Sequence, residues 1–166
     1  MKTERTEDLL KPIASNLYFY NSDAITLRRA FGKNVDAIDM KTKFSYLDVT
    51  NGIEKFDYLS RINFFIVTLF ARQLDLTNSM NMEDYLHDLY CGNPTDSEKK
   101  KITKLFEENK STTNLLKELS YFVKLANKNG IKINEYSLYT DLLNWKNSAY
   151  SWARKIVRKG DKKIND

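Results

Sequence analysis

Apolar residues recur every three or four positions along most of this chain, the spacing of helices that each bury one face. No segment shows the strict alternation of apolar and polar residues that marks a half-buried strand. The pattern therefore predicts an all-α protein of about eight or nine helices, with roughly 60% or more of its residues helical. The scarcity of turn formers, 5 Gly and 2 Pro, also favours long helices joined by short connections.

Start and stop signals divide the chain into predicted elements. The predicted helices cover residues 6–20, 23–31, 53–74, 82–91, 95–108, 112–129, 135–145 and 148–160, whereas residues 33–52 show no strong period. Side chains that can accept a hydrogen bond from the first turn precede most of these helices, namely Ser22, Asn81, Thr95, Ser111, Asn134 and Ser148. Thr95 with Glu98 forms an expected capping box. Gly32 and Gly130 are expected to end two of the helices.

Charge balance changes at the segment Gly92, Asn93 and Pro94, whose residues favour a turn. Residues 1–90 hold 11 Lys and Arg against 13 Asp and Glu, a net charge of −2; residues 91–166 hold 16 against 9, a net charge of +7. We therefore expect two small helical bundles packed together, over residues 1–91 and, for the basic one, residues 92–166. A one-sided basic excess is typical of proteins that bind nucleic acid or an anionic membrane, and a solvated lysine-rich surface gives the same signal.

The most apolar run, residues 62–71, is bracketed by Arg61 and Arg72. Ten helical residues span about 15 Å, half of a bilayer's hydrocarbon core, so the run predicts a buried central helix and no membrane span. One cysteine, Cys91, excludes an internal disulfide and fits a reducing cytoplasm, where we expect the protein to be located.

The sequence lacks the residues that most catalytic and cofactor sites need. His87 is the one histidine; it shares a predicted helix face with Cys91, but two ligands do not make a zinc site. No second histidine exists to act as a base for a nucleophile, and no glycine-rich phosphate loop is present. We therefore expect no catalytic residue, no metal and no cofactor, although carboxylates that converge from separate segments are not excluded by sequence.

The predicted last helix carries the clearest binding signal. At about 100° per residue, its cations fill one arc of the helix, namely Arg154, Lys155, Arg158 and Lys159. Its apolar residues fill the rest, namely Ala149, Trp152, Ala153, Ile156 and Val157. Cations one turn apart repel each other, and a phosphate backbone would relieve that repulsion. Complementation of the helix dipole is the alternative explanation, because these residues lie at the C-terminal end.

Two further basic segments join this helix as candidates. In the first, Arg28 and Arg29 precede Lys33, which is placed one turn after Arg29. In the second, a lysine run opens the predicted helix after Pro94, where solvation or a weak electrostatic contribution explains it equally well. The full set of candidate nucleic-acid-binding residues is Arg28, Arg29, Lys33, Arg61, Lys100, Lys101, Lys104, Lys146, Arg154, Lys155, Arg158 and Lys159.

Five short motifs occur in an order that resembles one family. They are Ala24 with Leu27–Ala30, Phe70–Ala71, Asn129–Ile131, Asp141–Trp145 and Trp152–Arg154. In this order the chain resembles the CasB family, the small subunit of the type I-E CRISPR surveillance complex called Cascade. The resemblance covers residues 24–157. Family members often carry several arginines just before the last motif, where this chain has Asn147, Ala149, Tyr150 and Ser151.

The resemblance implies a non-catalytic antiviral-defence protein of two helical units. It implies that copies sit head to tail inside an RNA-guided complex, in contact with the backbone and large subunits. There the family supports the duplex of CRISPR RNA (crRNA) and target DNA, and the displaced DNA strand. By residue matching, Arg28 and Arg29 correspond to the family's paired arginines, and Lys146 and Arg154 fall in its basic C-terminal region.

Three other functions stay open on the sequence. A stand-alone helical DNA-binding regulator would strongly prefer one duplex sequence. A purely structural adaptor would show no salt-sensitive DNA binding. A small nuclease, the least favoured, would cleave nucleic acid in the presence of a divalent metal.

Overall fold

The computed structural model describes residues 2–158, and helices, including two single-turn 3-10 helices, hold 72% of them. Within this range the α-helices are α1 (Lys2–Phe19), α2 (Asn21–Arg29), α3 (Met40–Thr50), α4 (Arg61–Arg72), α5 (Met82–Cys91), α6 (Asp96–Lys104), α7 (Thr112–Lys128), α8 (Glu135–Leu143) and α9 (Trp145–Val157). The 3-10 helices are η1 (Val35–Ala37) and η2 (Glu54–Phe56), and two short strands are β1 (Asn78–Met80) and β2 (Ile131–Ile133). The predicted all-α class and helix number are confirmed.

Several predicted helix boundaries are confirmed in atomic detail. Thr95 and Glu98 form both hydrogen bonds of the capping box at the start of α6. Ser111 Oγ accepts the backbone N–H of Asn114 at 3.1 Å, which opens α7. Asn134 Oδ1 accepts two backbone N–H groups at the start of α8. At each of these ends a short polar side chain satisfies donors that have no partner within the helix.

Other predicted boundaries are wrong. Ser22 and Ser148 lie inside α2 and α9, which begin at Asn21 and Trp145. Asn81 precedes α5 as predicted, but its side chain makes no capping bond and instead accepts the hydroxyl of Ser137 at 3.0 Å. The Asn81 side chain therefore bonds to a residue distant in the sequence, and not to the first turn of its own helix.

The region between α2 and α4 contains structure that the sequence pattern did not predict. Residues 33–52 include α3, whose N-cap, Asp39, accepts the backbone N–H of Thr42 at 2.9 Å. Its buried face includes Ser45 and two threonines, so it does not stand out as an apolar stripe. The predicted helix over 53–74 begins only after Ser60, whose hydroxyl caps α4, and η2 occupies part of the remainder.

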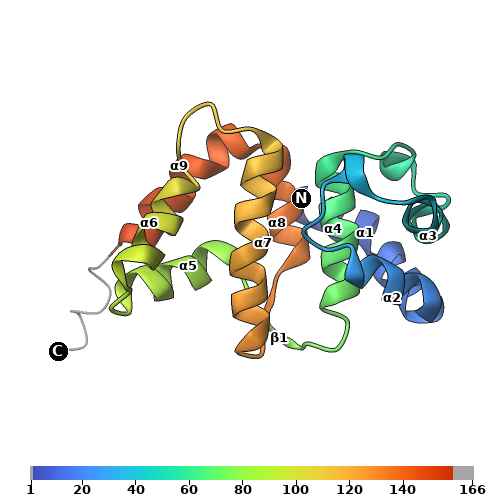
Figure 1. The fold of residues 1–166 in the computed structure, drawn as a ribbon, viewed down its shortest axis with the longest axis horizontal. Helices are drawn as coiled ribbons and strands as arrows, with labels where there is room; N and C mark the ends of the chain where they lie inside the picture. The colour runs from blue at the N-terminus through green and yellow to red at the C-terminus, as the bar shows by residue number, and fades with distance from the viewer. Residues whose placement is uncertain (1, 159–166) are drawn as a thin grey trace.

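The helices gather in three groups along the long axis of the molecule (Figure 1). Helices α1 to α4 lie at one end, α7 and α8 lie in the middle, and α5, α6 and α9 lie at the other end. Helix α5 packs on α6 and α9, although it precedes the sequence boundary at Gly92. The division into bundles at that boundary stays a prediction, and the described residues place α5 with the second group.

Helix α4 is the most deeply buried helix and packs on helices of the first two groups. Every residue from Asn63 to Ala71 is buried, and α4 contacts α1, α2, α7 and α8. This confirms the predicted buried central helix. Among the described residues, no helix combines the length and apolar character needed to cross a membrane.

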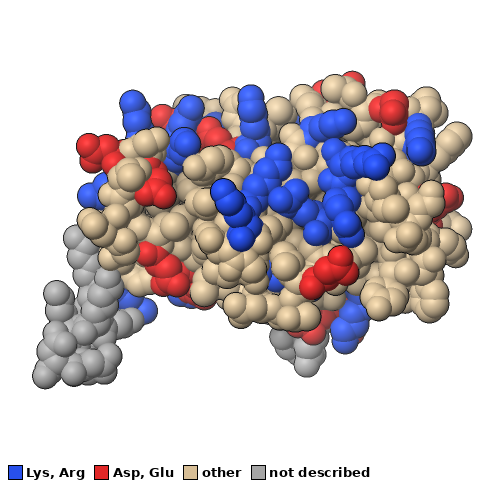
Figure 2. Space-filling model, turned by 60° about the horizontal axis from the view of Figure 1, so that its bottom comes forward, with Lys and Arg blue, Asp and Glu red and all other residues tan. Residues whose placement is uncertain are grey.

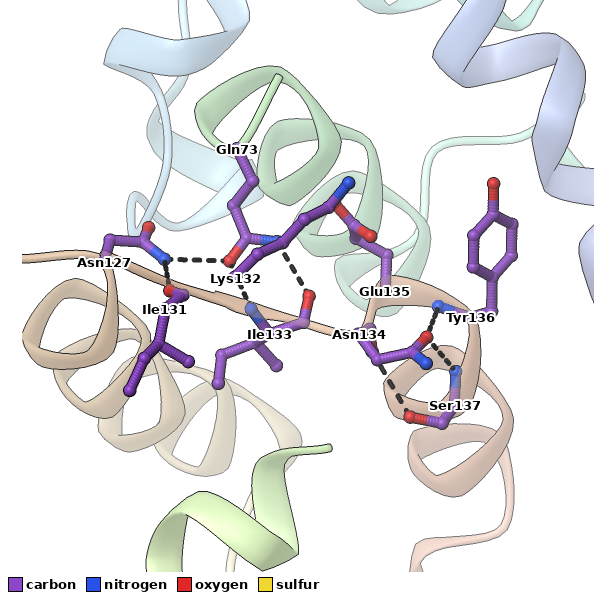
Figure 3. Close-up of polar contacts among 9 residues, drawn as sticks. All are labelled: Gln73, Asn127, Ile131, Lys132, Ile133, Asn134, Glu135, Tyr136 and Ser137. Carbon is purple, nitrogen blue, oxygen red and sulfur yellow. Dashed lines mark hydrogen bonds and ion pairs between the residues drawn. The ribbon is translucent and has the colours of Figure 1, made fainter. Parts of the chain in front are cut away.

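A buried amide joins the end of α4 to the middle group (Figure 3). Gln73 is fully buried, and its Nε2 donates to the carbonyl oxygen of Ile133 at 2.8 Å and to Glu135 Oε2 at 3.0 Å. Its Oε1 accepts the backbone N–H of Ile133 at 2.9 Å and Asn127 Nδ2 at 2.9 Å. One side chain therefore occupies the position that a neighbouring strand would take beside β2.

The two strands pair in parallel, with Ser79 opposite Lys132 in the centre of the register. Asn127 also donates from Nδ2 to the carbonyl oxygen of Ile131 at 2.9 Å, which ties the end of α7 to β2. These strands have three residues each, too short for an alternating pattern to be visible in the sequence.

We predict that Gln73→Ala lowers the free energy of unfolding by about 3 kcal/mol, because each buried group left without a partner costs about 1–3 kcal/mol. Chemical denaturation followed by circular dichroism measures the change. Asn147→Ala, which removes an exposed hydrogen bond to Asn144 at the start of α9, is the matched control and should change stability by less than about 0.5 kcal/mol. Equal effects of the two substitutions would contradict a central role for Gln73.

A second prediction concerns Glu135, whose side chain is 2% exposed. Burial raises the pKa of its carboxyl, and Lys132 Nζ at 3.8 Å offsets this only in part. Because the folded-state pKa is raised, the ionised carboxylate costs stability at neutral pH and the protonated acid does not. Glu135→Gln should therefore stabilise the protein at pH 7, and its advantage over the wild type should shrink as the pH falls through the raised folded-state pKa. A pH-independent difference in melting temperature would refute this.

Candidate nucleic-acid interface

Helix α9 is held by its apolar face, as predicted. Trp152 and Ile156 are buried, and Trp152 Nε1 donates to Asp141 Oδ2 of α8 at 2.9 Å. The ring of Trp152 meets that of Trp145 edge to face, with centroids 4.9 Å apart. Val157, however, is 49% exposed, so the predicted apolar arc is wrong at that residue.

The cations of α9 face outward, but they are not equivalent. Arg154, Lys155 and Arg158 are exposed, whereas Lys159 lies outside the described residues. Lys155 Nζ lies 3.2 Å from Asp84 Oδ1 of α5, and the Arg154 guanidinium lies 5.9 Å from the ring centre of Tyr150. Lys146 is exposed on the first turn of α9, where it lines a hollow together with Phe106 and Trp145. An intramolecular carboxylate therefore offsets part of the charge that the sequence assigned to this face.

Two lysines of the run in α6 contact residues of α7. Lys101 Nζ lies 4.2 Å from the ring centre of Tyr121, and Lys104 Nζ lies 3.9 Å from Glu118 Oε2. Lys100 is exposed, and among the described residues its ammonium group has no charged partner. These contacts favour the interpretation of this run as a partly neutralised surface.

A different group of cations meets where α2, α4 and α7 come together. The Arg72 guanidinium carbon lies 5.5 Å and the Lys124 Nζ 6.0 Å from the ring centre of Phe31. Arg28 is bonded to the carbonyl oxygen of Ala71, and its charge acts on Arg72. We call Arg28, Arg72 and Lys124 the central basic face. Figure 2 shows Lys and Arg side chains gathered over the middle of this side of the molecule.

Hydrogen bonds hold the two arginines in position. Arg72 Nε donates to Asn127 Oδ1 at 2.8 Å, and Arg28 Nε donates to the carbonyl oxygen of Ala71 at 3.3 Å. Burial, and then the charge of Arg28, lowers the pKa of Arg72. Within the described part of the chain, no carboxylate forms an ion pair with any residue of the central basic face. The two arginines are thus fixed close together, and no carboxylate forms an ion pair with them among the described residues.

More cations border the central basic face. Lys33 and Lys117 line an adjoining pocket, together with Arg61, whose guanidinium lies 2.7 Å from Asp36 Oδ2. Helix α2 ends at Arg29, so the prediction that Lys33 follows one helical turn after Arg29 is wrong. Gly32 has a φ of 85°, which turns the chain out of the helix before Lys33. Arg29 is exposed on the last turn of α2.

Sequence reasoning missed Arg72, Lys117 and Lys124. In the sequence Arg72 marks the end of an apolar run, and the two lysines lie on α7, where the apolar stripe is the dominant pattern. Their charge becomes a shared feature only when α4 and α7 pack beside α2. A helical-wheel projection of α7 places Lys117 and Lys124 two turns apart on one face, and this was the available signal.

His87 and Cys91, the other residues with possible metal-binding chemistry, lie on α5 beside the end of α9. His87 Nδ1 lies 3.1 Å from the carbonyl oxygen of Ile156 and 3.6 Å from Cys91 Sγ, so histidine and cysteine share the helix face expected of them. In residues 2–158 no three His, Cys, Asp or Glu side chains come together as a metal site would require.

No protein-family model matches this sequence, and neither a curated protein nor a solved structure matches it at a significant level. The fold and surface themselves define an all-α protein with a concentrated basic face.

The contact between Lys155 and Asp84 leads to a stability prediction. A double-mutant cycle of Lys155→Ala and Asp84→Asn should give a coupling energy of about 0.5 kcal/mol, typical of a half-exposed ion pair. Thermal or chemical denaturation of the four proteins measures it, and the coupling should decline with added salt. Strict additivity at low salt would show that Lys155 is not engaged with α5.

Proposed function

We propose that this protein is a non-catalytic subunit that binds the phosphate backbone of nucleic acid through the central basic face. The observation that supports this most directly is the convergence of Arg28, Arg72 and Lys124 with no ion-pairing carboxylate among the described residues. Like charges held together repel one another, and phosphate oxygens relieve that repulsion with release of counterions.

The geometry favours backbone contact over reading of base edges. The three cations come from three separate elements, and two of them, Arg72 and Lys124, lie over the Phe31 ring. Together they present a positive surface that no single helix forms. Arginine offers a planar fork that suits phosphate oxygens, and lysine a flexible point charge. Such contacts position a strand and carry no sequence information themselves. The basic face of α9, with Arg154 and Arg158, would then act as a second, weaker contact region.

The resemblance to the CasB family suggests the setting for this activity. In that setting the protein is a small subunit of an RNA-guided antiviral complex in the cytoplasm, and contacts the crRNA–target duplex or the displaced strand. Its partners would be the backbone and large Cascade subunits and a second copy of itself, arranged head to tail. Arg28, matched to the first of the family's paired arginines, belongs to the central basic face.

The two binding alternatives make different predictions. A stand-alone regulator would discriminate between duplex sequences by factors of about 10³ or more, because it would read base edges. A structural adaptor would bind no nucleic acid. The broad distribution of cations over α2, α4 and α7 favours sequence-independent contact over both.

The proposal predicts that Arg28→Ala with Lys124→Ala weakens DNA binding and flattens its salt dependence. Each phosphate contact contributes a slope of about 0.7–0.9 to the plot of log binding constant against log salt, so the slope should fall by roughly 1.5. Fluorescence anisotropy with labelled single-stranded and duplex DNA of unrelated sequences measures both quantities. Arg154→Ala with Arg158→Ala should also weaken binding and reduce the slope, but by less.

Lys41→Ala with Lys55→Ala is the charge-matched control, since both lysines are exposed, lie on α3 and η2, and are not part of the central basic face. Circular dichroism confirms that helix content is unchanged in each variant. If the control pair reduces the slope as much as the central pair, only total charge matters and the assignment of a site is wrong.

A further inference from the structure

A pocket of about 320 Å³ opens beside the central basic face, between α4, α7 and the loop that follows α2. Gly32 links the two features. It lines the pocket, and a Cβ placed on it would lie 3.4 Å from Lys124 Nζ. A ligand that contacts the cations is therefore within reach of the pocket.

The inner surface of the pocket is apolar. Phe64, Phe65 and Leu116 contribute to it, and all three are otherwise buried in the core. Thr68 also lines it, but its hydroxyl donates to backbone carbonyl oxygens of α4 at 3.0 and 2.9 Å. The Thr68 hydroxyl is thus already hydrogen-bonded within the helix. The inner surface of the pocket, its floor, therefore suits a flat apolar group better than a charged one.

The rim of the pocket is polar and positive. Lys33 and Lys117 are exposed there, and among the described residues neither ammonium group forms an ion pair. Arg61 is fixed on the rim by Asp36. The side chain of Asn114, also on the rim, is exposed and offers both an amide donor and a carbonyl acceptor.

We infer that this pocket accepts one unpaired nucleobase from a strand bound along the central basic face. The inference rests on the proposed function and adds the form of nucleic acid that the protein prefers. A nucleobase combines a flat apolar face, for the floor, with hydrogen-bonding edges, for Asn114, and its phosphates would reach Lys33 and Lys117. The volume lies at the lower end of the range of about 300–1,000 Å³ for small-molecule pockets, which suits one nucleoside unit.

Base insertion requires an unstacked base, so the pocket predicts a preference for single strands over fully paired duplexes. Enzymes and binding proteins that hold an extruded base combine apolar packing with hydrogen bonds to its edge. The present pocket has both components and lies beside cations that hold the backbone.

The test compares two labelled oligonucleotides of equal length, one of thymidines and one with abasic sites, which carry the same phosphates. The wild type should bind the thymidine strand roughly tenfold more tightly, in the range seen for a single stacked base. Asn114→Trp fills the pocket from the rim and should reduce thymidine-strand binding to the abasic level, leaving abasic binding unchanged. Ser97→Trp, at an exposed site in the first turn of α6, is the matched control and should alter neither.

Three outcomes overturn the inference. If the wild type binds both strands with equal affinity and with the expected salt dependence, the pocket does not bind a base, and the proposed function still stands. Loss of binding to both strands in Asn114→Trp, with helix content intact, shows that the residue affects the backbone contact and not a base. Absence of binding to either strand by the wild type overturns the proposed function as well.

A free nucleotide offers the same base and phosphate as a nucleotide within a strand. A competition experiment distinguishes these two ligands. Thymidine 5′-monophosphate should displace the thymidine strand only at concentrations far above that of the strand, because it lacks the neighbouring phosphates. Displacement at equal concentration would instead make a free nucleotide the ligand.

Discussion

The arrangement of the middle of this protein depends on one buried amide. Gln73 uses both its oxygen and its nitrogen, and bonds to β2, to α7 through Asn127 and to α8 through Glu135. A buried amide with every partner satisfied specifies a single arrangement, since any displacement leaves polar groups without partners in a low-dielectric interior. Gln73 directly follows α4, so these bonds tie the end of α4 to the neighbouring elements at one defined position.

The same amide network extends to the surface. Asn127 contacts Gln73 through its nitrogen and Arg72 through its oxygen, so the position of the half-buried Arg72 guanidinium depends on the core. Arg72 then lies against Phe31 and near Arg28, which brings α2 into the same cluster. The repulsion among these cations is thus countered by a rigid support, which keeps them clustered when no ligand is bound. Preorganisation of this kind lowers the ordering cost of binding.

Local chemistry predicted much of the fold. Thr95, Ser111 and Asn134 mark helix starts because the bond that each makes lies within three residues in the sequence. Features that depend on distant partners were not predictable in this way. Helix α3 buries Ser45, whose hydroxyl donates to Asp23 Oδ1 at 2.8 Å, so polar residues occupy its inner face. The basic surface was predicted in part, at Arg28 and on α9, but Arg72 and Lys124 join it through packing between helices far apart in the chain.

The position of α5 has a consequence for how the chain acquires its structure during synthesis. This helix is made before residue 92, yet one of its main packing partners, α9, lies at residues 145–157. While the ribosome makes the intervening segment, α5 can pack on α6 but lacks α9, which Asp84 and His87 contact in the finished fold. The end of the molecule built from α5, α6 and α9 is therefore completed last, and a chain that stops before Trp152 leaves an apolar surface open to chaperones or to self-association.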